Sequence, residues 1–183
     1  TLTEGRPSVV AIRTASGYDE NELLRLAASL EVSSEHPLAA AIVRSANERG
    51  LQLSSVSEFD SPVGKGVTGL VDGKRIVIGN AHIMQQANID TRALDRAADD
   101  LRKDGATAIF MSVDENAAGI LAIADPIKAT TPEAVKTLKD AGIRVIMLTG
   151  DNATTAKAVA QKLGISDVEA EVLPDGKAKI VER

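Results

Sequence analysis

The first part of the chain changes from strand spacing to helical spacing of its apolar residues. A short apolar run at Ser8–Ile12 predicts a strand, and the apolar residues after it recur at i, i+3, i+4 and i+7. This recurrence predicts an amphipathic helix that opens at Asp19–Glu22 and ends near Glu31. A second helix is predicted from Pro37 to about Arg49, because proline is favoured at the first helical position. The apolar positions of the first helix are Leu23, Leu26, Ala27 and Leu30.

Hairpin signals dominate the middle of the chain. Asp72-Gly73 stands between two apolar runs, which is among the strongest short-range signals for a β-hairpin. Helices beside successive hairpins are typical of an α+β domain built on an antiparallel sheet. The predicted elements are strands at Val56–Val63, Val67–Val71, Lys74–Ile78, Ala108–Val113 and Gly119–Ala124, with a helix at Thr91–Lys103.

From Asp125 onward the pattern changes to strand–loop–helix units. Thr131-Pro132 indicates a capping threonine followed by proline at the first position of a helix, which is predicted to end at Gly142. The nearly continuous apolar run Ile143–Leu148 predicts a strand that is covered on both faces, as in a parallel sheet. Thr149-Gly150-Asp151 follows this strand directly.

Thr149 and Asp151 therefore lie where a parallel sheet binds its ligands. A further helix, predicted to stop at Gly164, completes the unit, and such units build doubly wound sheets with ligands at the carboxyl ends of the strands. The alternative is ordinary capping chemistry, because aspartate and asparagine often begin helices. From the residues alone both interpretations stay open.

Composition narrows the functional classes. The 183 residues carry a net charge of −5, so neither nucleic acid nor an anionic membrane is expected as a partner. The chain has no cysteine and two histidines, which excludes disulfides and thiolate metal sites and leaves no predicted metal centre. No apolar run approaches the length of roughly 20 residues that a membrane-spanning helix needs.

His36 stands between the first two predicted helices. Because Pro37 suits the first helical position, His36 is predicted to be the capping residue, with its ring at the mouth of the helix. Glu31 then faces His36 across a tight helix–helix junction. The junction is either a capped turn with an exposed histidine or a binding site, and the spacing alone favours the capped turn.

The run Gly64–Gly69 matches the dinucleotide fingerprint G-x-G-x-x-G letter by letter. The context does not fit that fingerprint, because strand and hairpin sequence follows where a helix is required. Glycines beside a strand still allow a backbone to approach a ligand closely, and Lys65 adds a positive charge there. The alternative is a glycine-bearing bulge or turn.

Taken together, these motifs resemble those of the heavy-metal-transporting P-type ATPases. The resemblance extends over the whole chain, and the motifs occur in the family's order. It favours a binding role for His36 over the capped turn alone. The sequences that carry it are Thr1–Gly5, Ser34-Glu35-His36-Pro37-Leu38, Gly64-Lys65-Gly66, Gly79-Asn80, Asp125-Pro126-Ile127-Lys128, Met147–Asn152 and Leu173–Lys177.

The resemblance implies an α/β fold made of two domains. Residues 9–123 would form an α+β nucleotide-binding domain with an antiparallel sheet. Residues 1–8 and 124–183 would form part of a parallel-sheet, haloacid-dehalogenase-like phosphorylation domain. Neither the family's D-K-T-G sequence, which carries the phosphorylated aspartate, nor its G-D-G-x-N-D sequence is present. We therefore expect a fragment that binds ATP without hydrolysing it, and whose magnesium site is incomplete.

The resemblance also implies roles for individual residues. His36 would lie against the adenine ring and Glu31 would accept from its amino group, while the glycines would admit the ribose and phosphates. In the second domain, Thr149 and Lys177 would hold the transferred phosphoryl group, and Asp151 would orient this site or its magnesium water. The implied nucleotide-binding residues are Glu31, His36, Gly64, Gly66, Gly79 and Asn80, and the implied phosphoryl-site residues are Thr149, Asp151 and Lys177.

The expected parent protein is an ATP-driven export pump that works through an aspartyl-phosphate intermediate. Its partners would be ATP and the pump's own actuator and transmembrane domains, and this part would be a cytoplasmic domain at a bacterial plasma membrane, without direct membrane contact. The sequences around His36, Asp125 and Leu173 look more like copper exporters than zinc or cadmium exporters. A zinc or cadmium exporter and a non-catalytic nucleotide-binding module are the alternatives. A free-standing phosphatase would need an Asp-x-Asp triplet, which the chain lacks.

Overall fold

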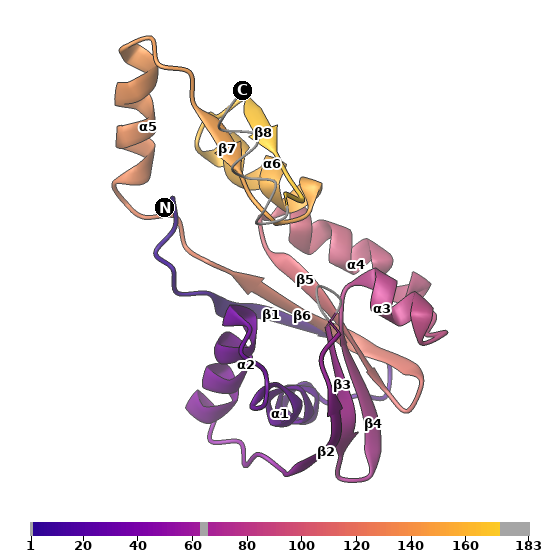
Figure 1. Cartoon of the computed structure of the whole chain (residues 1–183). Coiled ribbons are helices and arrows are strands. Elements are labelled where there is room, and N and C mark those ends of the chain that lie inside the picture. Colours follow the sequence, from indigo (N-terminus) through magenta and orange to yellow (C-terminus); the bar gives the residue numbers. More distant parts are fainter. Residues whose placement is uncertain (1, 63–65, 173–183) are drawn as a thin grey trace.

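The computed structural model describes residues 2–62 and 66–172, which form a large and a small unit (Figure 1). Their elements follow one another along the chain as β1 (Ser8–Thr14), α1 (Glu20–Glu31), α2 (Pro37–Glu48), β2 (Val56–Asp60), β3 (Gly66–Val71), β4 (Lys74–Gly79), α3 (Ala81–Gln86), α4 (Arg92–Lys103), β5 (Thr107–Val113), β6 (Asn116–Ala124), α5 (Thr131–Asp140), β7 (Ile146–Leu148), α6 (Ala153–Lys162) and β8 (Asp167–Glu169). We call residues 8–124 the large unit and the described residues from 125 onward the small unit.

The large unit is a six-stranded antiparallel sheet in the order β1-β6-β5-β4-β3-β2. Neighbouring residues of one strand serve opposite faces: Ile76 and Ile78 of β4 join the core under α1 and α2, whereas Val77 joins the core under α3 and α4. Helices therefore cover both faces, as Figure 1 shows. This double cover explains why β5 and β6 are almost continuously apolar although the sheet is antiparallel.

The predicted hairpin is confirmed. Asp72 and Gly73 both adopt positive φ, +50° and +75°, which is the geometry of a tight turn between two strands with right-handed twist. Arg25 of α1 fastens this turn to the helix, because its guanidinium donates to the Asp72 carboxylate at 2.8 Å and to the Ser54 hydroxyl at 2.7 Å. The β3–β4 hairpin is thus held against α1.

The small unit has its own sheet and its own core. Strands β7 and β8 pair in parallel, and a third apolar cluster is formed by α5, β7, α6 and the residues around them. The predicted combination of an antiparallel and a parallel α/β part is confirmed. Within the described residues, no helix is both long and apolar enough to cross a lipid bilayer.

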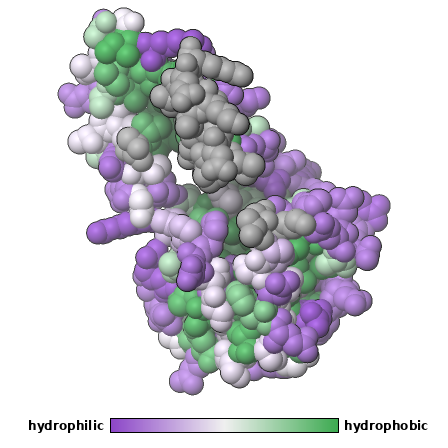
Figure 2. Space-filling view, viewed as in Figure 1, coloured by the Kyte–Doolittle hydropathy of each residue, from purple (hydrophilic) through white to green (hydrophobic). Residues whose placement is uncertain are grey.

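Three details of the predicted small unit are wrong. The strand predicted at Ile143–Leu148 is only Ile146–Leu148, and Ile143 and Ile146 are 51% and 41% exposed. Met147 of β7 is buried, whereas its neighbour Ile146 points to the opposite face and is exposed, so the described residues do not cover both faces of the strand. Figure 2 shows apolar surface on this unit. Thr131 is not a cap either: it is the first helical residue, and its hydroxyl donates to the Leu2 carbonyl at 2.8 Å.

Details of the large unit also differ from prediction: β1 extends to Thr14, and β6 begins at Asn116. Helix α3 was not predicted by the apolar pattern, because six residues are too few to show a helical period. Strand β2 ends at Asp60, before the predicted end at Val63, which lies outside the described residues.

The chain passes between the two units twice, at the start of β1 and at the end of β6. The carboxylate of Asp125 accepts the backbone amides of Gly5 at 3.1 Å and Arg6 at 2.9 Å. Thr3 forms an isolated bridge with Ile127. The N-terminal segment is therefore aligned on the segment that leaves β6.

Candidate functional site

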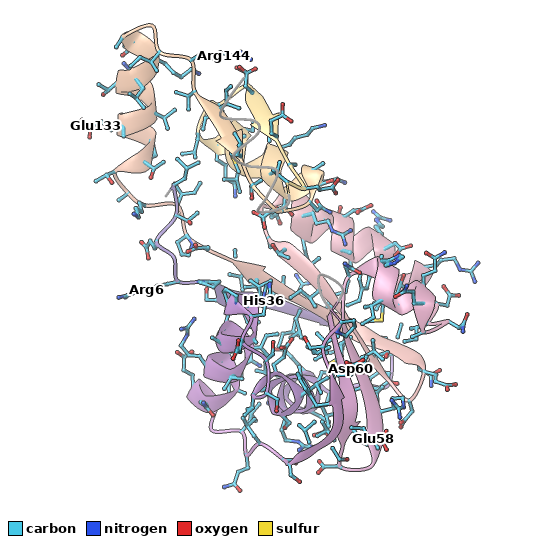
Figure 3. The ribbon with its side chains drawn as sticks, in the orientation of Figure 1. Arg6, His36, Glu58, Asp60, Glu133 and Arg144 are labelled. Atoms are coloured by element: carbon cyan, nitrogen blue, oxygen red, sulfur yellow. The ribbon has the colours of Figure 1, made fainter. Side chains whose placement is uncertain are left out.

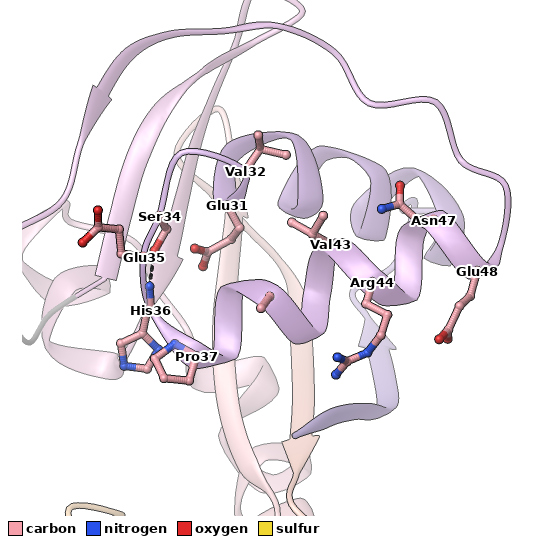
Figure 4. Close-up of a pocket in the computed structure, with 11 residues that line it drawn as sticks. Glu31, Val32, Ser34, Glu35, His36, Pro37, Val43, Arg44, Asn47 and Glu48 are labelled. Carbon is pink, nitrogen blue, oxygen red and sulfur yellow. Dashed lines mark hydrogen bonds between the residues drawn. The ribbon is translucent and has the colours of Figure 1, made fainter. Parts of the chain in front are cut away.

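The turn between α1 and α2 carries an open hollow of about 500 Å³ (Figure 4). Helix α1 ends at Glu31, where the Ser34 amide donates to the Glu31 carbonyl at 2.9 Å, and α2 begins directly after His36. Both of the residues that the resemblance assigned to adenine thus border one hollow. Its lining is formed by Glu31, Val32, Ser34, Glu35, His36, Pro37, Ala40, Val43, Arg44, Asn47 and Glu48.

Glu31 is a buried carboxyl group with spare hydrogen-bonding capacity. The residue is 8% exposed, and its Oε2 atom is fully buried without a hydrogen-bond partner. Burial raises the pKa of Glu31 above its ordinary value of 4.5, while a hydrogen bond with the Ser34 side chain lowers it by a smaller amount. A buried acceptor without a donor is costly, so a hydrogen-bond donor placed at this oxygen would lower the cost of burying it.

Replacement of Glu31 by glutamine is expected to change how stability depends on pH. Because the pKa is raised in the folded state, the contribution of Glu31 to stability is full below the ordinary value and is lost as pH rises through the folded value. Glutamine does not ionise, so Glu31→Gln should melt at a higher temperature than wild type at about pH 7, with a smaller difference at about pH 4. Thermal melts across this range check the result.

Glu35→Gln is the matched control, since Glu35 lies in the same turn and is exposed. Its melting temperature relative to wild type should not follow the same pH trend. A Glu31→Gln difference that stayed constant with pH would contradict the assignment of an ionisation penalty to this carboxyl.

His36 is the N-cap of α2, as predicted. Its Nδ1 atom accepts the Leu38 amide at 3.2 Å, and its own amide donates to the Ser34 hydroxyl at 3.3 Å. Acceptance at Nδ1 assigns the ring proton of the neutral form to Nε2. The capped turn and the binding site are therefore compatible, because one ring edge is tethered while the exposed ring stands beside the hollow.

Ser34 is a site residue that the sequence analysis did not assign. Its hydroxyl accepts from the His36 amide at 3.3 Å, and its side chain lowers the pKa of the Glu31 carboxyl. Ser34 therefore fixes the backbone at His36 and acts electrostatically on Glu31. The available signal was a serine two residues before a predicted cap, a spacing typical of local side-chain turns.

Gly66 and Gly79 are direct partners across the β3–β4 ladder. Their φ angles are +147° and +159°, and a Cβ on Gly66 would lie 2.0 Å from the Ile78 carbonyl oxygen. Packing alone therefore requires glycine at Gly66. Gly64 and Lys65 lie outside the described residues.

Asn80 follows β4 directly and caps α3. Its Oδ1 atom accepts the Ile83 amide at 3.1 Å. The Gly79-Asn80 pair thus turns the chain from the end of β4 into α3.

Thr149 and Asp151 form a closed pair after β7. The Thr149 hydroxyl donates to Asp151 Oδ2 at 2.8 Å and accepts from the Asp151 amide at 3.1 Å. Capping of α6 is done by Asn152, whose Oδ1 accepts the amides of Thr154 and Thr155. The Asp151 carboxylate is therefore used inside the loop and does not cap the helix. Lys177 lies outside the described residues.

The residues implied by the resemblance thus fall into three local groups: Glu31 with His36, Gly66 with Gly79 and Asn80, and Thr149 with Asp151. The part of the chain that the structure describes contains no group of three or more histidine, aspartate or glutamate side chains that could hold a metal ion. In the third group Asp151 supplies a carboxylate beside the Thr149 hydroxyl, and carboxylate oxygen is a ligand type that Mg²⁺ prefers.

Comparison with known proteins identifies the kind of fold. Residues 1–183 match a model described as a haloacid dehalogenase-like hydrolase. The chain is 49% identical over 183 residues to a silver exporting P-type ATPase of Salmonella typhimurium, covering 100% of this chain and 22% of that protein. It is 50% identical over 181 residues to a copper-exporting P-type ATPase of Legionella pneumophila, covering 99% of this chain and 24% of that protein. The chain therefore spans about a quarter or less of these relatives.

Solved structures agree with this assignment. A zinc-transporting PIB-type ATPase in the E2.Pi state has a TM-score of 0.73 and 35% identity, over 99% of this chain and 29% of that chain. A catalytic CPx-ATPase domain, CopB-B, has a TM-score of 0.68 and 26% identity, over 100% of this chain and 61% of that chain. The chain belongs to the haloacid dehalogenase-like hydrolases, and its similarity to the heavy-metal-transporting P-type ATPases, which the motifs predicted, extends over its whole length.

Proposed function

We propose that this chain is the ATP-binding cytoplasmic part of a bacterial copper export pump that works through an aspartyl-phosphate intermediate. The observation that carries the proposal is the buried Oε2 of Glu31, which lacks a hydrogen-bond partner beside the tethered ring of His36. The adenine amino group is a donor of the required kind, and its ring presents a flat face to the imidazole. The silver- and copper-exporting names of the relatives support the cargo.

The two units would divide the work. The six-stranded sheet begins at Ser8 and ends at Ala124, which supports residues 9–123 as the nucleotide-binding domain and residues 1–8 and 124–183 as part of the phosphorylation domain. Figure 3 shows His36 at the end of the large unit nearer to the small unit, whereas Glu58 lies toward the opposite end. A nucleotide whose base lies at His36 would extend its phosphates toward the small unit.

Each residue group would have one task. Glu31 and His36 would bind the base, and the glycine backbone at Gly66 and Gly79 would let the sugar and phosphates approach closely. Thr149 and Lys177 would hold the transferred phosphoryl group, with Lys177 supplying positive charge, and Asp151 would orient this site or its magnesium water. Mg²⁺ would require ligands beyond the described residues. In the parent pump the actuator and transmembrane domains would be the partners, and a zinc or cadmium cargo is the alternative.

Nucleotide binding by the chain tests the proposal. We expect ATP to bind saturably in calorimetry and GTP to bind more weakly, because guanine presents a carbonyl oxygen where adenine presents its amino group. That oxygen would face the Glu31 acceptor and leave it unpaired, which typically costs about 1–3 kcal/mol. We expect no phosphate release above buffer. Equal affinity for ATP and GTP would contradict a hydrogen bond between Glu31 and the base. Phosphate release proportional to protein concentration would contradict the expected lack of turnover.

A further inference from the structure

The large and small units touch at a place far along the chain from the two connecting segments. The corner after α4, residues Asp104–Ala106, packs against α6, and Figure 1 shows the end of α4 beside α6. A Cβ on Gly105 would lie 3.5 Å from Val159 Cγ2, so backbone and side chain are in close contact. The units are therefore linked here as well as at the two connecting segments.

Thr155 makes the buried hydrogen bond of this contact. The residue is 4% exposed, and its hydroxyl donates to the Ala106 carbonyl at 2.8 Å. Its own amide donates to Asn152 Oδ1 at 3.1 Å, inside the cap that begins α6. One residue thus bonds to the large unit through its side chain and to the end of the Thr149–Asn152 loop through its backbone.

A second bond lies at the rim of the contact. Lys162 Nζ donates to the Asp104 carbonyl at 2.7 Å. Helix α4 ends there with Gly105 at φ +90°, and the amides of Gly105 and Ala106 turn back to Arg102 and Leu101. The carbonyls at a helix C-terminus carry partial negative charge, which suits an ammonium group from the opposite unit.

We propose that Thr155 is a positioning residue that docks α6, and with it the preceding Thr149–Asn152 loop, on the large unit. The loop enters α6 directly and shares the Asn152 cap with Thr155, so displacement of Thr155 displaces the loop. A role of that loop at the phosphoryl group rests on the proposed function. The docking of α6 on the large unit does not rest on the proposed function, because the contact needs no nucleotide.

Distance measurement between the units tests the docking in the intact chain. The sequence has no cysteine, so Ala93→Cys in α4 and Lys157→Cys in α6 provide the two sites for spin labels, both at exposed positions. Without nucleotide, we expect one narrow distance distribution. Thr155→Val keeps the branched shape but removes the hydroxyl and leaves the Ala106 carbonyl unpaired, which should raise the ratio of undocked to docked molecules about 5- to 150-fold.

Matched variants separate docking from general damage. Thr155→Ser restores the donor and should return the narrow distribution. Thr137→Val makes the same chemical change at an exposed bond within α5, from the Thr137 hydroxyl to the Glu133 carbonyl, and should leave the distances unchanged. If Thr155→Val does not fold, Lys162→Met removes the rim bond from an exposed side chain and should broaden the distribution in the same direction. Wild-type distances in a folded Thr155→Val, or in Lys162→Met if Thr155→Val does not fold, would overturn the proposal.

Discussion

Gly66→Ala is expected to lower the free energy of unfolding by about 2–6 kcal/mol. The added Cβ would lie 2.0 Å from the Ile78 carbonyl oxygen and 2.8 Å from the Gly79 Cα, where only a backbone shift could make room. The φ angle of +147° adds conformational strain that L residues rarely tolerate. Overpacking and strain of this kind each cost about 1–3 kcal/mol. Chemical denaturation, together with a thermal melt, measures this loss of unfolding free energy.

Two other glycines separate the two costs. Gly73 has φ +75° and no atom within 4 Å of its added Cβ, so Gly73→Ala measures strain without a clash. An added Cβ on Gly119 would lie 2.5 Å from the Arg13 carbonyl oxygen, and Gly119 is not among the residues with positive φ, so Gly119→Ala measures a clash without that strain. The loss of unfolding free energy in Gly66→Ala should be larger than the loss in Gly73→Ala or in Gly119→Ala. A melt of Gly66→Ala no lower than that of Gly73→Ala would show that β3 and β4 can separate at little cost.

Substitutions at Gly66 cannot isolate a contact with the nucleotide. Because Gly66 pairs directly with Gly79, a substitution disturbs both of the glycines proposed to admit the ribose and phosphates. Loss of ATP affinity in such a variant would report a displaced strand, and only side chains outside the ladder can report the base contact.

His36→Asn is expected to weaken ATP binding by about 5- to 150-fold while keeping the fold. Asparagine is a good N-cap residue, so it can replace the bond that Nδ1 accepts from the Leu38 amide. It lacks the flat ring on which the base would stack, a contact worth roughly 1–3 kcal/mol by truncation in other proteins. Calorimetry and thermal melts of the same samples measure both quantities.

His36→Ala and Glu31→Ala extend this experiment. His36→Ala should lose the same affinity and in addition about 0.5–2 kcal/mol of stability, because the cap is removed as well. The double variant with Glu31→Ala should lose less affinity than the sum of the single losses, since both side chains would touch one adenine. His82→Ala is the control, because His82 is exposed on α3, away from the hollow. If His36→Asn binds ATP as well as wild type, the histidine is a cap alone and the base lies elsewhere.

Local sequence rules determined much of this fold. The helical recurrence up to Glu31, the proline after His36 and the Asp72-Gly73 turn predicted α1, α2 and the β3–β4 hairpin within one or two residues. These features depend on a few neighbouring residues, since backbone preferences and hydrogen bonds to adjacent amides act over one turn. The motifs likewise indicated Glu31 and His36, which line the hollow, as candidate site residues.

The errors arose where an element depends on distant partners. The apolar run at Ile143–Leu148 predicted a strand covered on both faces, but this cover depends on which distant elements pack on each face, and Ile146 is exposed. Thr131 looked like a cap, yet its hydroxyl bonds to Leu2, at the other end of the chain. A pattern of local spacing carries no information about such partners.

The sequence by itself determined the family resemblance, the order of the helices and hairpins, and the identities of Glu31 and His36 as candidates. Only the tertiary structure decided that Glu31 is buried with an oxygen left unpaired, that Gly66 lies against Gly79, and that Thr155 crosses to Ala106. Burial and pairing depend on how separate elements pack, and packing brings together atoms that no local rule relates.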